Sequence, residues 1–191
     1  MATLSVIIPT AGRASLRRTL ESLTDQLKAG DEVIVVGDIH DGPIVTTPQI
    51  VADAGPAVRY VTHDAGHHCW GHCQLNYGMM QARGNYLVFN DDDDIATPGA
   101  LAAIRTAIAA REISGPLLFQ FVTPWRQILW ATPMMTLGAI GGHCLVTPNN
   151  PARTGVFGCD YMGDFTMIQD TVSKWGGEVA WIPQVIAQCR P

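Results

Sequence analysis

Four consecutive aspartates, Asp91 to Asp94, stand where an apolar run of the sequence ends. The five residues before them, YLVFN at 86–90, are typical of a buried strand. Side chains of a strand alternate between its faces, so Asp91 and Asp93 are predicted to project together, with Asp92 and Asp94 on the other side. Two carboxylates about 4 Å apart repel by roughly 4 kcal/mol at an effective dielectric of 20. A divalent cation bound by these hard oxygen ligands removes that repulsion, so the pattern predicts a metal site.

Two other interpretations of the aspartates explain the sequence less well. A solvated acidic turn before a helix suits one pair of acids, but four acids in a row after a strand exceed what such a turn needs. A calcium-binding EF-hand loop that begins at Asp91 requires glycine and glutamate where this chain has Ala96 and Ala102. Ligands of open α/β sheets bind at the carboxyl ends of strands, where these acids are expected. We therefore expect Asp91 and Asp93 to bind a metal.

A second group of chemically reactive side chains lies between residues 63 and 73, which read HDAGHHCWGHC. Cys69 and Cys73 stand four residues apart, and two neighbouring histidines would complete a tetrahedral zinc site. Ligands this close in sequence strain a single site, and packing of Trp70 explains the segment without any metal. Both interpretations stay open at this point, and the residues concerned are His67, His68, Cys69, His72 and Cys73.

The apolar patterns around these residues predict the strands that hold them in place. Short runs suited to buried strands, the first of them β-branched, occur at 4–8, 32–36, 57–61, 86–90, 117–122 and 178–183. Residues 123–155 are rich in Gly, Pro, Met and Trp and have no clear period, which suits loops and short strands around a pocket.

Helices are predicted between these strands, where apolar residues recur at helical spacing. They are expected from Ser15 to Gly30, over 74–83, from Thr97 to near Gly115 and over 165–175. Ser15 and Thr97 are the predicted N-caps of their helices. Such an alternation of strands and helices indicates an α/β fold with a doubly wound, mostly parallel central sheet and helices on both faces.

Composition limits the kinds of protein that this chain can be. Its 191 residues are enough for one domain with a sizeable core, and 47% are hydrophobic against 15% charged, unlike disordered chains. A net charge of −5 argues against nonspecific binding of nucleic acid, which needs clustered Lys and Arg. The opening residues, MATLSVIIPTAGR, lack the features of a signal peptide or membrane span, so we expect a cytoplasmic protein. The five cysteines, an odd number, predict reduced thiols.

The motifs together resemble those of the family 2 nucleotide-sugar glycosyltransferases, which have the GT-A fold. The most specific match is NYGMMQARGNYLVFNDDDD at 76–94, which follows the family pattern N-x-G-x-x-x-A-x-G-x-Y-x-x-F-x-D-x-D-D position by position. SVIIPTAGR resembles the family's first strand and donor loop, and VIVVGDIHDG resembles its second strand and acidic loop. The resemblance implies a single Rossmann-like GT-A domain over residues 1–191, with a nucleotide-sugar-binding half at 1–94 and an acceptor-binding half at 95–191.

The resemblance also implies roles for individual residues at the donor site. The loop after the first strand would line the nucleotide pocket, and Asp38 would accept a hydrogen bond from the base. The acids of the DxD motif would contact the donor ribose and a Mn²⁺ or Mg²⁺ ion that bridges the diphosphate, with Asp91 and Asp93 as metal ligands. The implied donor-binding residues are Pro9, Thr10, Gly12, Arg13, Asp38, Asn76, Asp91 and Asp92.

The segment GDFTMIQDTVSKWGGEVAWIP at 163–183 resembles the family's late Glu-Asp-x-x-Leu helix and final strand. This match places Asp164 at the position of the general base of an inverting reaction. A base is needed because the acceptor hydroxyl must lose its proton as it attacks, while charge grows on the departing diphosphate. Without the resemblance, Asp164 is best explained as a helix N-cap. Asp170 is a second candidate base or a solvated residue on the polar face.

This chain departs from the family pattern at several positions. Gly37 replaces the first acid of the second-strand loop, and Gly163 replaces the glutamate before the proposed base, so charges are missing beside both sites. The late helix lacks the Q-x-x-R-W motif, which argues against a processive polysaccharide synthase.

The resemblance adds a third interpretation of the segment between residues 63 and 73, as a loop that runs past the donor diphosphate. Contacts with phosphates or acceptor would then come from His68, Trp70, His72 or Gln74. His143, after two glycines in the acceptor region, would be a late metal or phosphate ligand or a loop histidine with a structural hydrogen bond.

We therefore expect a metal-dependent, inverting glycosyltransferase that moves a sugar from a nucleoside-diphosphate sugar, with a UDP-sugar as first choice, to an unidentified hydroxyl acceptor. Membranes and nucleic acids are not expected partners, whereas a homo-oligomer is compatible with the sequence. One alternative is a sugar-nucleotide pyrophosphorylase-like nucleotidyltransferase, which would need a phosphate loop richer in glycine than PTAGRAS. The other is a non-catalytic nucleotide-sugar-binding module, with or without zinc.

Overall fold

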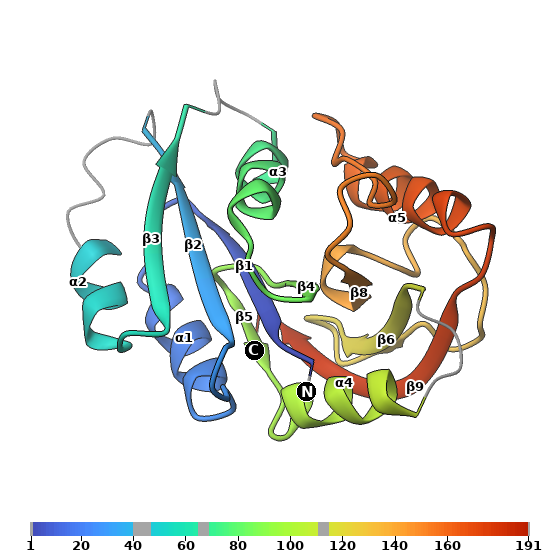
Figure 1. Ribbon diagram of the computed structural model, residues 1–191, viewed down its shortest axis with the longest axis horizontal. Helices are drawn as coiled ribbons and strands as arrows, with labels where there is room; N and C mark the ends of the chain where they lie inside the picture. Colours follow the sequence, from blue (N-terminus) through green and yellow to red (C-terminus); the bar gives the residue numbers. More distant parts are fainter. Residues whose placement is uncertain (1, 40–46, 65–68, 111–114, 191) are drawn as a thin grey trace.

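The computed structural model of the chain describes residues 2–39, 47–64, 69–110 and 115–190. Within these ranges the strands form one nine-stranded sheet in the order β3-β2-β1-β4-β8-β6-β9-β5, and β7 pairs with β6. The strands are β1 (Leu4–Thr10), β2 (Glu32–Asp38), β3 (Val58–His63), β4 (Tyr86–Phe89), β5 (Asp94–Ala96), β6 (Leu117–Val122), β7 (Ile128–Leu129), β8 (Leu145–Pro148) and β9 (Ala180–Cys189). Figure 1 shows β1, β2 and β3 in one half of the molecule and β6, β8 and β9 in the other.

The first four strands in this order are parallel. β1 is central among them, with Ile7 opposite Ile34 of β2 and opposite Phe89 of β4. The chain therefore leaves β1 toward β2 on one side, while β4 lies on the other side. This reversal makes the carboxyl end of β1 a topological switch point, the usual place for a ligand crevice in an open α/β sheet.

The second half of the sheet is mixed. β8 runs antiparallel to β4 and β6, whereas β9 runs parallel to β6 and antiparallel to β5. Register shifts on either side of Gln120 interrupt the pairing of β6 with β9, as bulges do. The pairing of β5 with β9 sets Asp94 opposite Cys189 and so brings the end of the described chain next to the last of the four aspartates.

Helices cover both faces of the sheet (Figure 1). They are α1 (Leu16–Thr24), α2 (Thr47–Asp53), α3 (His72–Gln81), α4 (Ala100–Ala109) and α5 (Gly163–Lys174), with a short 3₁₀ helix, η1 (Gly142–Cys144). Apolar side chains of α1, α2 and α4 join one buried cluster with Val6 and Ile8, and those of α3 and α5 join another with Ile7. This division follows from the alternation of side chains along β1.

The predicted α/β fold with a mostly parallel sheet and helices on both faces is confirmed. β6 has the predicted bounds, and the other five predicted strands overlap β1, β2, β3, β4 and β9. The sequence did not predict α2, β5 or η1, and it gave no bounds for β7 and β8. These elements are too short for a periodic pattern to indicate them.

One of the two predicted helix caps lies at the predicted position. Ser15 is the N-cap residue of α1, although its side chain makes no cap hydrogen bond, and α1 ends at Thr24, well before Gly30. The hydroxyl of Thr97 donates to the carbonyl of Val185, 2.9 Å away, and α4 begins only at Ala100. Thr97 therefore stabilises a contact with β9, which the local sequence does not reveal.

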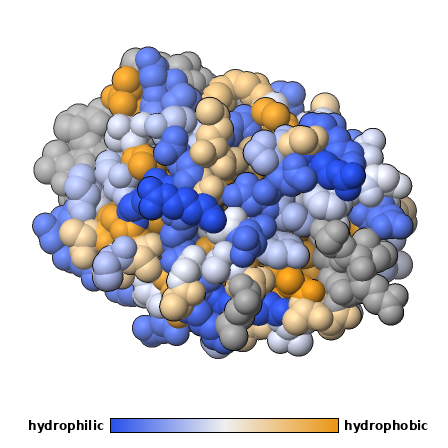
Figure 2. All heavy atoms as spheres, in the orientation of Figure 1, coloured by the Kyte–Doolittle hydropathy of each residue, from blue (hydrophilic) through white to orange (hydrophobic). Residues whose placement is uncertain are grey.

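The surface in the view of Figure 1 is mixed in character. Figure 2 shows hydrophobic residues in separate small groups among hydrophilic ones on this face. None of the helices within the described ranges has both the length and the apolar character that a membrane crossing requires.

Candidate active site

A cavity of about 390 Å³ opens at the switch point, beyond the carboxyl ends of β1, β2 and β4. Thr10 lines it from β1, Asp38 from β2 and Phe89 from β4. These residues converge because the carboxyl ends of parallel strands lie at one edge of the sheet. Segments far along the chain also contribute to the wall, through Gly142, His143, Tyr161, Asp164 and Arg190.

The aspartates form a tight turn instead of continuing the strand. β4 ends before Asn90, whose side-chain amide donates to the backbone carbonyls of Asp91 and Asp94 at 3.2 and 3.3 Å. Because the strand has ended, the side chains no longer alternate, and Asp91, Asp92 and Asp93 all line the cavity. The predicted separation of Asp92 from its two neighbours is therefore wrong. Asp94 is buried at the start of β5.

Asp92 fixes the loop after β1. Its carboxylate accepts hydrogen bonds from the Thr10 hydroxyl at 2.7 Å and the Ala11 amide at 3.2 Å, and it pairs with Arg13 at 2.7 Å. The residue is only 2% exposed, so these contacts replace its lost hydration. Arg13 also lies 3.5 Å from Asp93. Asp92 thus holds the predicted nucleotide loop against the acidic turn.

The carboxyl group of Asp91 is costly to ionise in its surroundings. Burial, together with the carboxylates of Asp94, Asp164, Asp93 and Asp92, raises the pKa of Asp91 to about 8. Among the residues that the structure describes, none forms a hydrogen bond or ion pair with its carboxylate. A divalent cation would stabilise the ionised form, and carboxylate oxygens are the ligands that Mg²⁺ and Mn²⁺ favour. The acidic turn therefore fits such an ion.

Arg190 brings a positive charge to the acidic turn from the far end of the described chain. Its Nε lies 3.3 Å from a carboxylate oxygen of Asp93, and its backbone amide donates to Asp94 at 3.0 Å. Its side chain is 67% exposed and lines the cavity, so it remains accessible to an anionic ligand. No motif in the sequence indicates Arg190, because only the pairing of β5 with β9 brings it here.

Behind the acidic turn, the buried residues Asp94 and Cys189 form a cluster with the partly buried His143. Nδ1 of His143 is 3.9 Å from Asp94, and its Nε2 is 3.6 Å from the sulfur of Cys189. Burial raises the pKa of Asp94 and of Cys189 and lowers that of His143, so it favours the uncharged form of each group. His143 also lines the cavity, which is compatible with both roles considered from the sequence.

Asp164, on the first turn of α5, lines the same cavity as the acidic turn. Its Oδ2 accepts the amide of Gly142 at 3.0 Å, and its Oδ1 lies 3.1 Å from Nε2 of His72. Burial by itself would raise the pKa of Asp164, but these two contacts outweigh burial and the pKa is lowered. Asp170, the second candidate base, pairs with Lys174 at 2.7 Å and does not line the cavity.

His72 is held in a position that favours its positive charge. Its Nδ1 lies 2.6 Å from the carbonyl of Gly158, which can only accept, so Nδ1 carries a proton. A neutral ring would then present a bare Nε2 to the carboxylate of Asp164. Burial lowers the pKa of His72, but the hydrogen bond and charge of Asp164 outweigh it, so the pKa is raised. The two residues form an imidazolium–carboxylate pair beside the cavity.

Packing explains the two glycines at which this chain departs from the family pattern. A Cβ on Gly163 would lie 2.5 Å from the ring of His72 and would also clash with the carbonyl of Gly158. A Cβ on Gly37 would lie 3.0 Å from ring atoms of Tyr60, and it would lie even closer to the hydroxyl of Tyr60. The space that an acidic side chain would need at either position is therefore filled by another residue.

Two predicted donor-binding residues do not line the cavity. The amide group of Asn76 donates to the carbonyl of Phe157 and accepts its N–H, both at 2.9 Å, so Asn76 holds the loop before α5 against α3. Gly12 adopts a left-handed conformation, with φ 76°, and its amide donates to the hydroxyl of Thr10 at 3.0 Å. Both residues shape loops beside the cavity, whereas Pro9, Thr10, Arg13 and Asp38 form its surface.

The segment before α3 reaches the cavity, as the loop interpretation predicts. The lining residues from this segment and the start of α3 are Cys69, Trp70, Gly71, His72, Gln74 and Leu75. Trp70 is 62% exposed, so the alternative that it packs in the interior is wrong. Its ring meets that of Tyr161 edge to face, with centroids 6.5 Å apart. Aromatic surfaces of this kind are common in ligand pockets.

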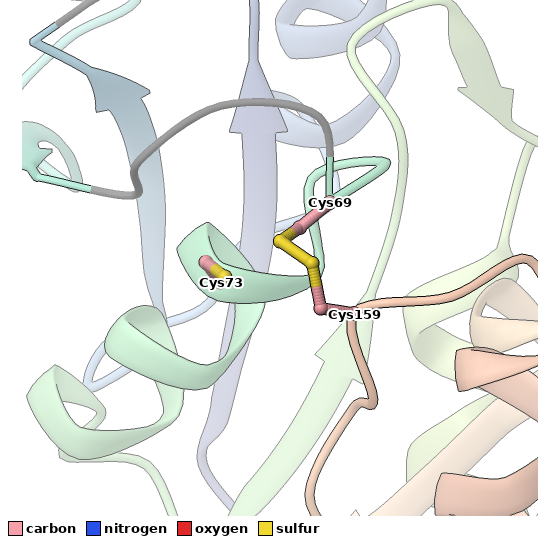
Figure 3. Close-up of side chains that lie close together, drawn as sticks. All are labelled: Cys69, Cys73 and Cys159. Carbon is pink, nitrogen blue, oxygen red and sulfur yellow. A yellow bond between two sulfur atoms is a disulfide. The ribbon is translucent and has the colours of Figure 1, made fainter.

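The structure corrects the prediction of reduced thiols. Cys69 and Cys159 form a disulfide although they are 90 positions apart in the sequence. Figure 3 shows the disulfide between the segment before α3 and the loop before α5, with Cys73 beside it on α3. The two cysteines meet because α3 packs against that loop, and no sequence spacing indicates this contact.

A zinc site of two cysteines and two histidines, one of the interpretations considered for this segment, is not formed by its described histidines. His72 pairs with Asp164, and His63 stacks on Tyr77 with ring centroids 4.5 Å apart. His67 and His68 lie outside the described residues.

Comparisons with known proteins bear on the family and the fold of this chain. The sequence matches the family described as glycosyl transferase family 2 over residues 5–138. A sequence comparison with curated proteins found no match. Among solved structures, S. aureus TarS superposes with a TM-score of 0.74 at 15% identity, covering 99% of this chain and 37% of that one.

Two further solved structures share the fold. Glucosyl-3-phosphoglycerate synthase from Mycobacterium tuberculosis, in complex with Mn²⁺, UDP and glucosyl-3-phosphoglycerate, has a TM-score of 0.73 at 15% identity, covering 100% of this chain and 72% of that one. The mannosyltransferase PcManGT from Pyrobaculum calidifontis, in complex with GDP-Man and Mn²⁺, has a TM-score of 0.70 at 21% identity, covering 97% and 56%. This chain thus spans 37% of the TarS chain and 56% of the mannosyltransferase.

The mostly parallel sheet, the acidic turn at its switch point and these structural similarities define a protein of the GT-A, Rossmann-like class. The predicted fold is thereby confirmed. The family match extends over more than half of the sequence, and the chain belongs to glycosyl transferase family 2.

Proposed function

We propose that this chain transfers a sugar from a nucleoside-diphosphate sugar to an acceptor hydroxyl, with inversion at the anomeric carbon. One observation carries the proposal: a single cavity is lined both by the acidic turn Asp91–Asp93 and by the ionised Asp164. The first is suited to a metal-bound diphosphate and the second to proton removal. Membership of glycosyl transferase family 2 supports this class of reaction.

The nucleotide would bind at the ends of β1 and β2. Asp38 is 3% exposed and lines the cavity, so it is placed to accept a hydrogen bond from a base. The loop after β1 is fixed by Asp92, which leaves Pro9 and Thr10 as a preformed wall. The solved relatives include complexes with UDP and with GDP-Man, and we take a UDP-sugar as the first donor to test.

Asp91 and Asp93 would hold a Mn²⁺ or Mg²⁺ ion. The raised pKa of Asp91 supports this assignment, because a carboxylate that is costly to ionise alone gains most from a cation. When bound, such an ion offsets the negative charge that grows on the departing diphosphate. Arg13 and Arg190 add fixed positive charge beside the same position.

Asp164 would accept the proton of the attacking hydroxyl. Gly142 and His72 hold its carboxylate, so it is oriented without losing its charge. Its lowered pKa makes it a weak base, which accepts the proton only when bonding to the anomeric carbon has acidified the hydroxyl. Direct displacement of the diphosphate by that hydroxyl inverts the configuration. Residues 1–94 would then supply the donor site, and 95–191 the base and most of the acceptor site.

Thermal melting with a panel of nucleotide sugars, with and without Mn²⁺, tests donor binding. A ligand that binds only the folded state at about a hundredfold excess over Kd stabilises it by about 2.7 kcal/mol. We expect a rise in the melting temperature for at least one donor, and a larger rise when Mn²⁺ is present. No shift with any donor would contradict the proposed function.

The variant Asp164→Asn separates catalysis from binding. Loss of a general base lowers kcat by about 10²–10⁴-fold, while the donor-induced thermal shift should remain. Asp170→Asn is the matched control, because Asp170 lies on the same helix but pairs with Lys174 outside the cavity. Equal loss of turnover in both variants, or none in Asp164→Asn, would show that Asp164 is not the base.

A further inference from the structure

Three cysteine sulfurs meet beside the cavity, and only two of them are needed for the disulfide. Cys69 and Cys159 are bonded, and the sulfurs of Cys69, Cys73 and Cys159 all lie within 4.8 Å of one another. Cys73 is a free, half-buried thiol on the first turn of α3, next to the disulfide in Figure 3. Neither the fold nor the proposed transfer reaction explains why a third thiol should stand here.

The spacing of these sulfurs suits a single soft metal ion. Thiolates bind Zn²⁺ at about 2.3 Å, which sets the sulfurs of a tetrahedral site about 3.8 Å apart. Sulfurs already within 4.8 Å reach that spacing by small side-chain rotations once the disulfide is open. Three thiolates from two separate segments also satisfy the preference of Zn²⁺ for soft ligands, with water in the fourth position.

We propose that, in the reduced protein, Cys69, Cys73 and Cys159 bind one Zn²⁺ ion, and that the disulfide is the metal-free, oxidised form of the same site. A phosphine or dithiol reductant supplies two electrons and is itself oxidised, and two protons from water or from the dithiol complete the conversion of the disulfide into two thiols. The three thiols then release three protons as they bind Zn²⁺ as thiolates. This site is separate from the oxygen ligands of the acidic turn, and the inference does not depend on sugar transfer.

The position of the site gives it a structural consequence. Cys69 precedes Trp70 and lies three residues before His72, while Cys159 follows Gly158, whose carbonyl accepts the hydrogen bond from His72. The bound metal, like the disulfide, would join the two segments that hold His72 against Asp164. The site would thereby fix the cavity wall in reducing and in oxidising conditions.

Cobalt titration of the full chain tests the proposal. Co²⁺ substitutes for Zn²⁺ and gives a thiolate-to-metal charge-transfer absorption that oxygen ligands do not produce. The protein is first reduced with a phosphine, which adds no competing thiol, and is freed of metal. We expect the absorption to saturate at one Co²⁺ per chain, to disappear when Zn²⁺ is added and to be absent in the oxidised protein.

Cysteine variants identify the ligands. Cys73→Ser should weaken Co²⁺ binding by about a hundredfold or more, since even outer-shell changes around metals cost about 10–100-fold. It keeps the disulfide, so an unchanged melting temperature of its oxidised form shows that it folds. Cys144→Ser is the control, because Cys144 is buried in another part of the core, where its thiol donates a hydrogen bond to the carbonyl of Gly141.

Two results would overturn the proposal: no charge-transfer absorption in the reduced wild-type protein, or full absorption in Cys73→Ser. If the absorption persisted in Cys73→Ser but was lost in Cys189→Ser, the metal would lie at Asp94, His143 and Cys189, whose ligand atoms also lie within 4.8 Å of one another.

Discussion

Asp164 can serve as a base only if its carboxylate stays ionised where burial opposes ionisation. The residue that makes this possible is His72, whose proton on Nδ1 is fixed by the carbonyl of Gly158. The sequence predicts Asp164 near the start of a helix and shows His72 as one of several histidines, but nothing in it indicates that these two side chains are in contact. At the scale of residues, the sequence thus indicates which side chains can act in a reaction, but it does not indicate which other side chains interact with their charges.

The pair predicts a shift in the pH dependence of the reaction. In His72→Gln the positive charge beside Asp164 is gone, so the lowered pKa of Asp164 rises. The protonated, inactive form then persists to higher pH, and the acidic limb of the kcat/KM profile should move to higher pH. His63→Gln is the matched control, because His63 stacks on Tyr77 and does not line the cavity. Identical acidic limbs in wild type and His72→Gln would refute the role of the pair.

At the scale of elements, the cavity depends on how closely the first turns of α3 and α5 approach. Gly163, the first residue of α5, leaves room for the ring of His72, the first residue of α3. Asn76 adds two hydrogen bonds between α3 and the loop before α5. The periodicity of the sequence predicts both helices, but the sequence shows Gly163 only as the loss of an acidic residue. The structure explains why this residue is glycine, because the ring of His72 in α3 fills the space beside it.

Although Gly163→Ala adds only one methyl group, it should therefore lower both the stability of the protein and its turnover. Its Cβ would lie 2.5 Å from the His72 ring, so α5 must move away from α3, at a cost of about 1–3 kcal/mol typical of overpacking. We expect a lower midpoint in urea denaturation together with reduced kcat. Gly142→Ala is the comparison, since its Cβ would meet Asp164 only at an ordinary 3.5 Å. Equal midpoints for the two variants would contradict this account.

At the scale of the whole molecule, the disulfide joins the two halves of the chain across the cavity. Cys69 precedes α3, in the half that carries the acidic turn, and Cys159 precedes α5, in the half that carries Asp164. A link between residues 90 positions apart restricts the unfolded chain strongly. It also keeps the walls of the cavity together, because Trp70 and Tyr161 stand next to the linked residues.

Loss of this link should be visible in stability. Cys159→Ser, compared with the oxidised wild-type protein in the absence of metal, should lower the free energy of unfolding by about 2–4 kcal/mol. That loss corresponds to roughly 2–4 °C in melting temperature for each kcal/mol in a chain of this size. Cys144→Ser removes a thiol elsewhere and should change the melting temperature less. If the oxidised wild-type protein and Cys159→Ser melted together, the disulfide would have no stabilising role.

The sequence by itself determined the α/β class, the order of the main strands and helices and the family, because periodicity and the motif at 76–94 are local properties. It also singled out Asp91, Asp93 and Asp164 by type and position. Only the tertiary structure decided what surrounds them: Arg13 bound to Asp92, Arg190 brought to Asp94 and Cys69 bonded to Cys159, at separations of 79, 96 and 90 residues. Contacts between residues so far apart in the sequence form only when the whole chain folds, so no pattern of neighbouring residues can indicate them.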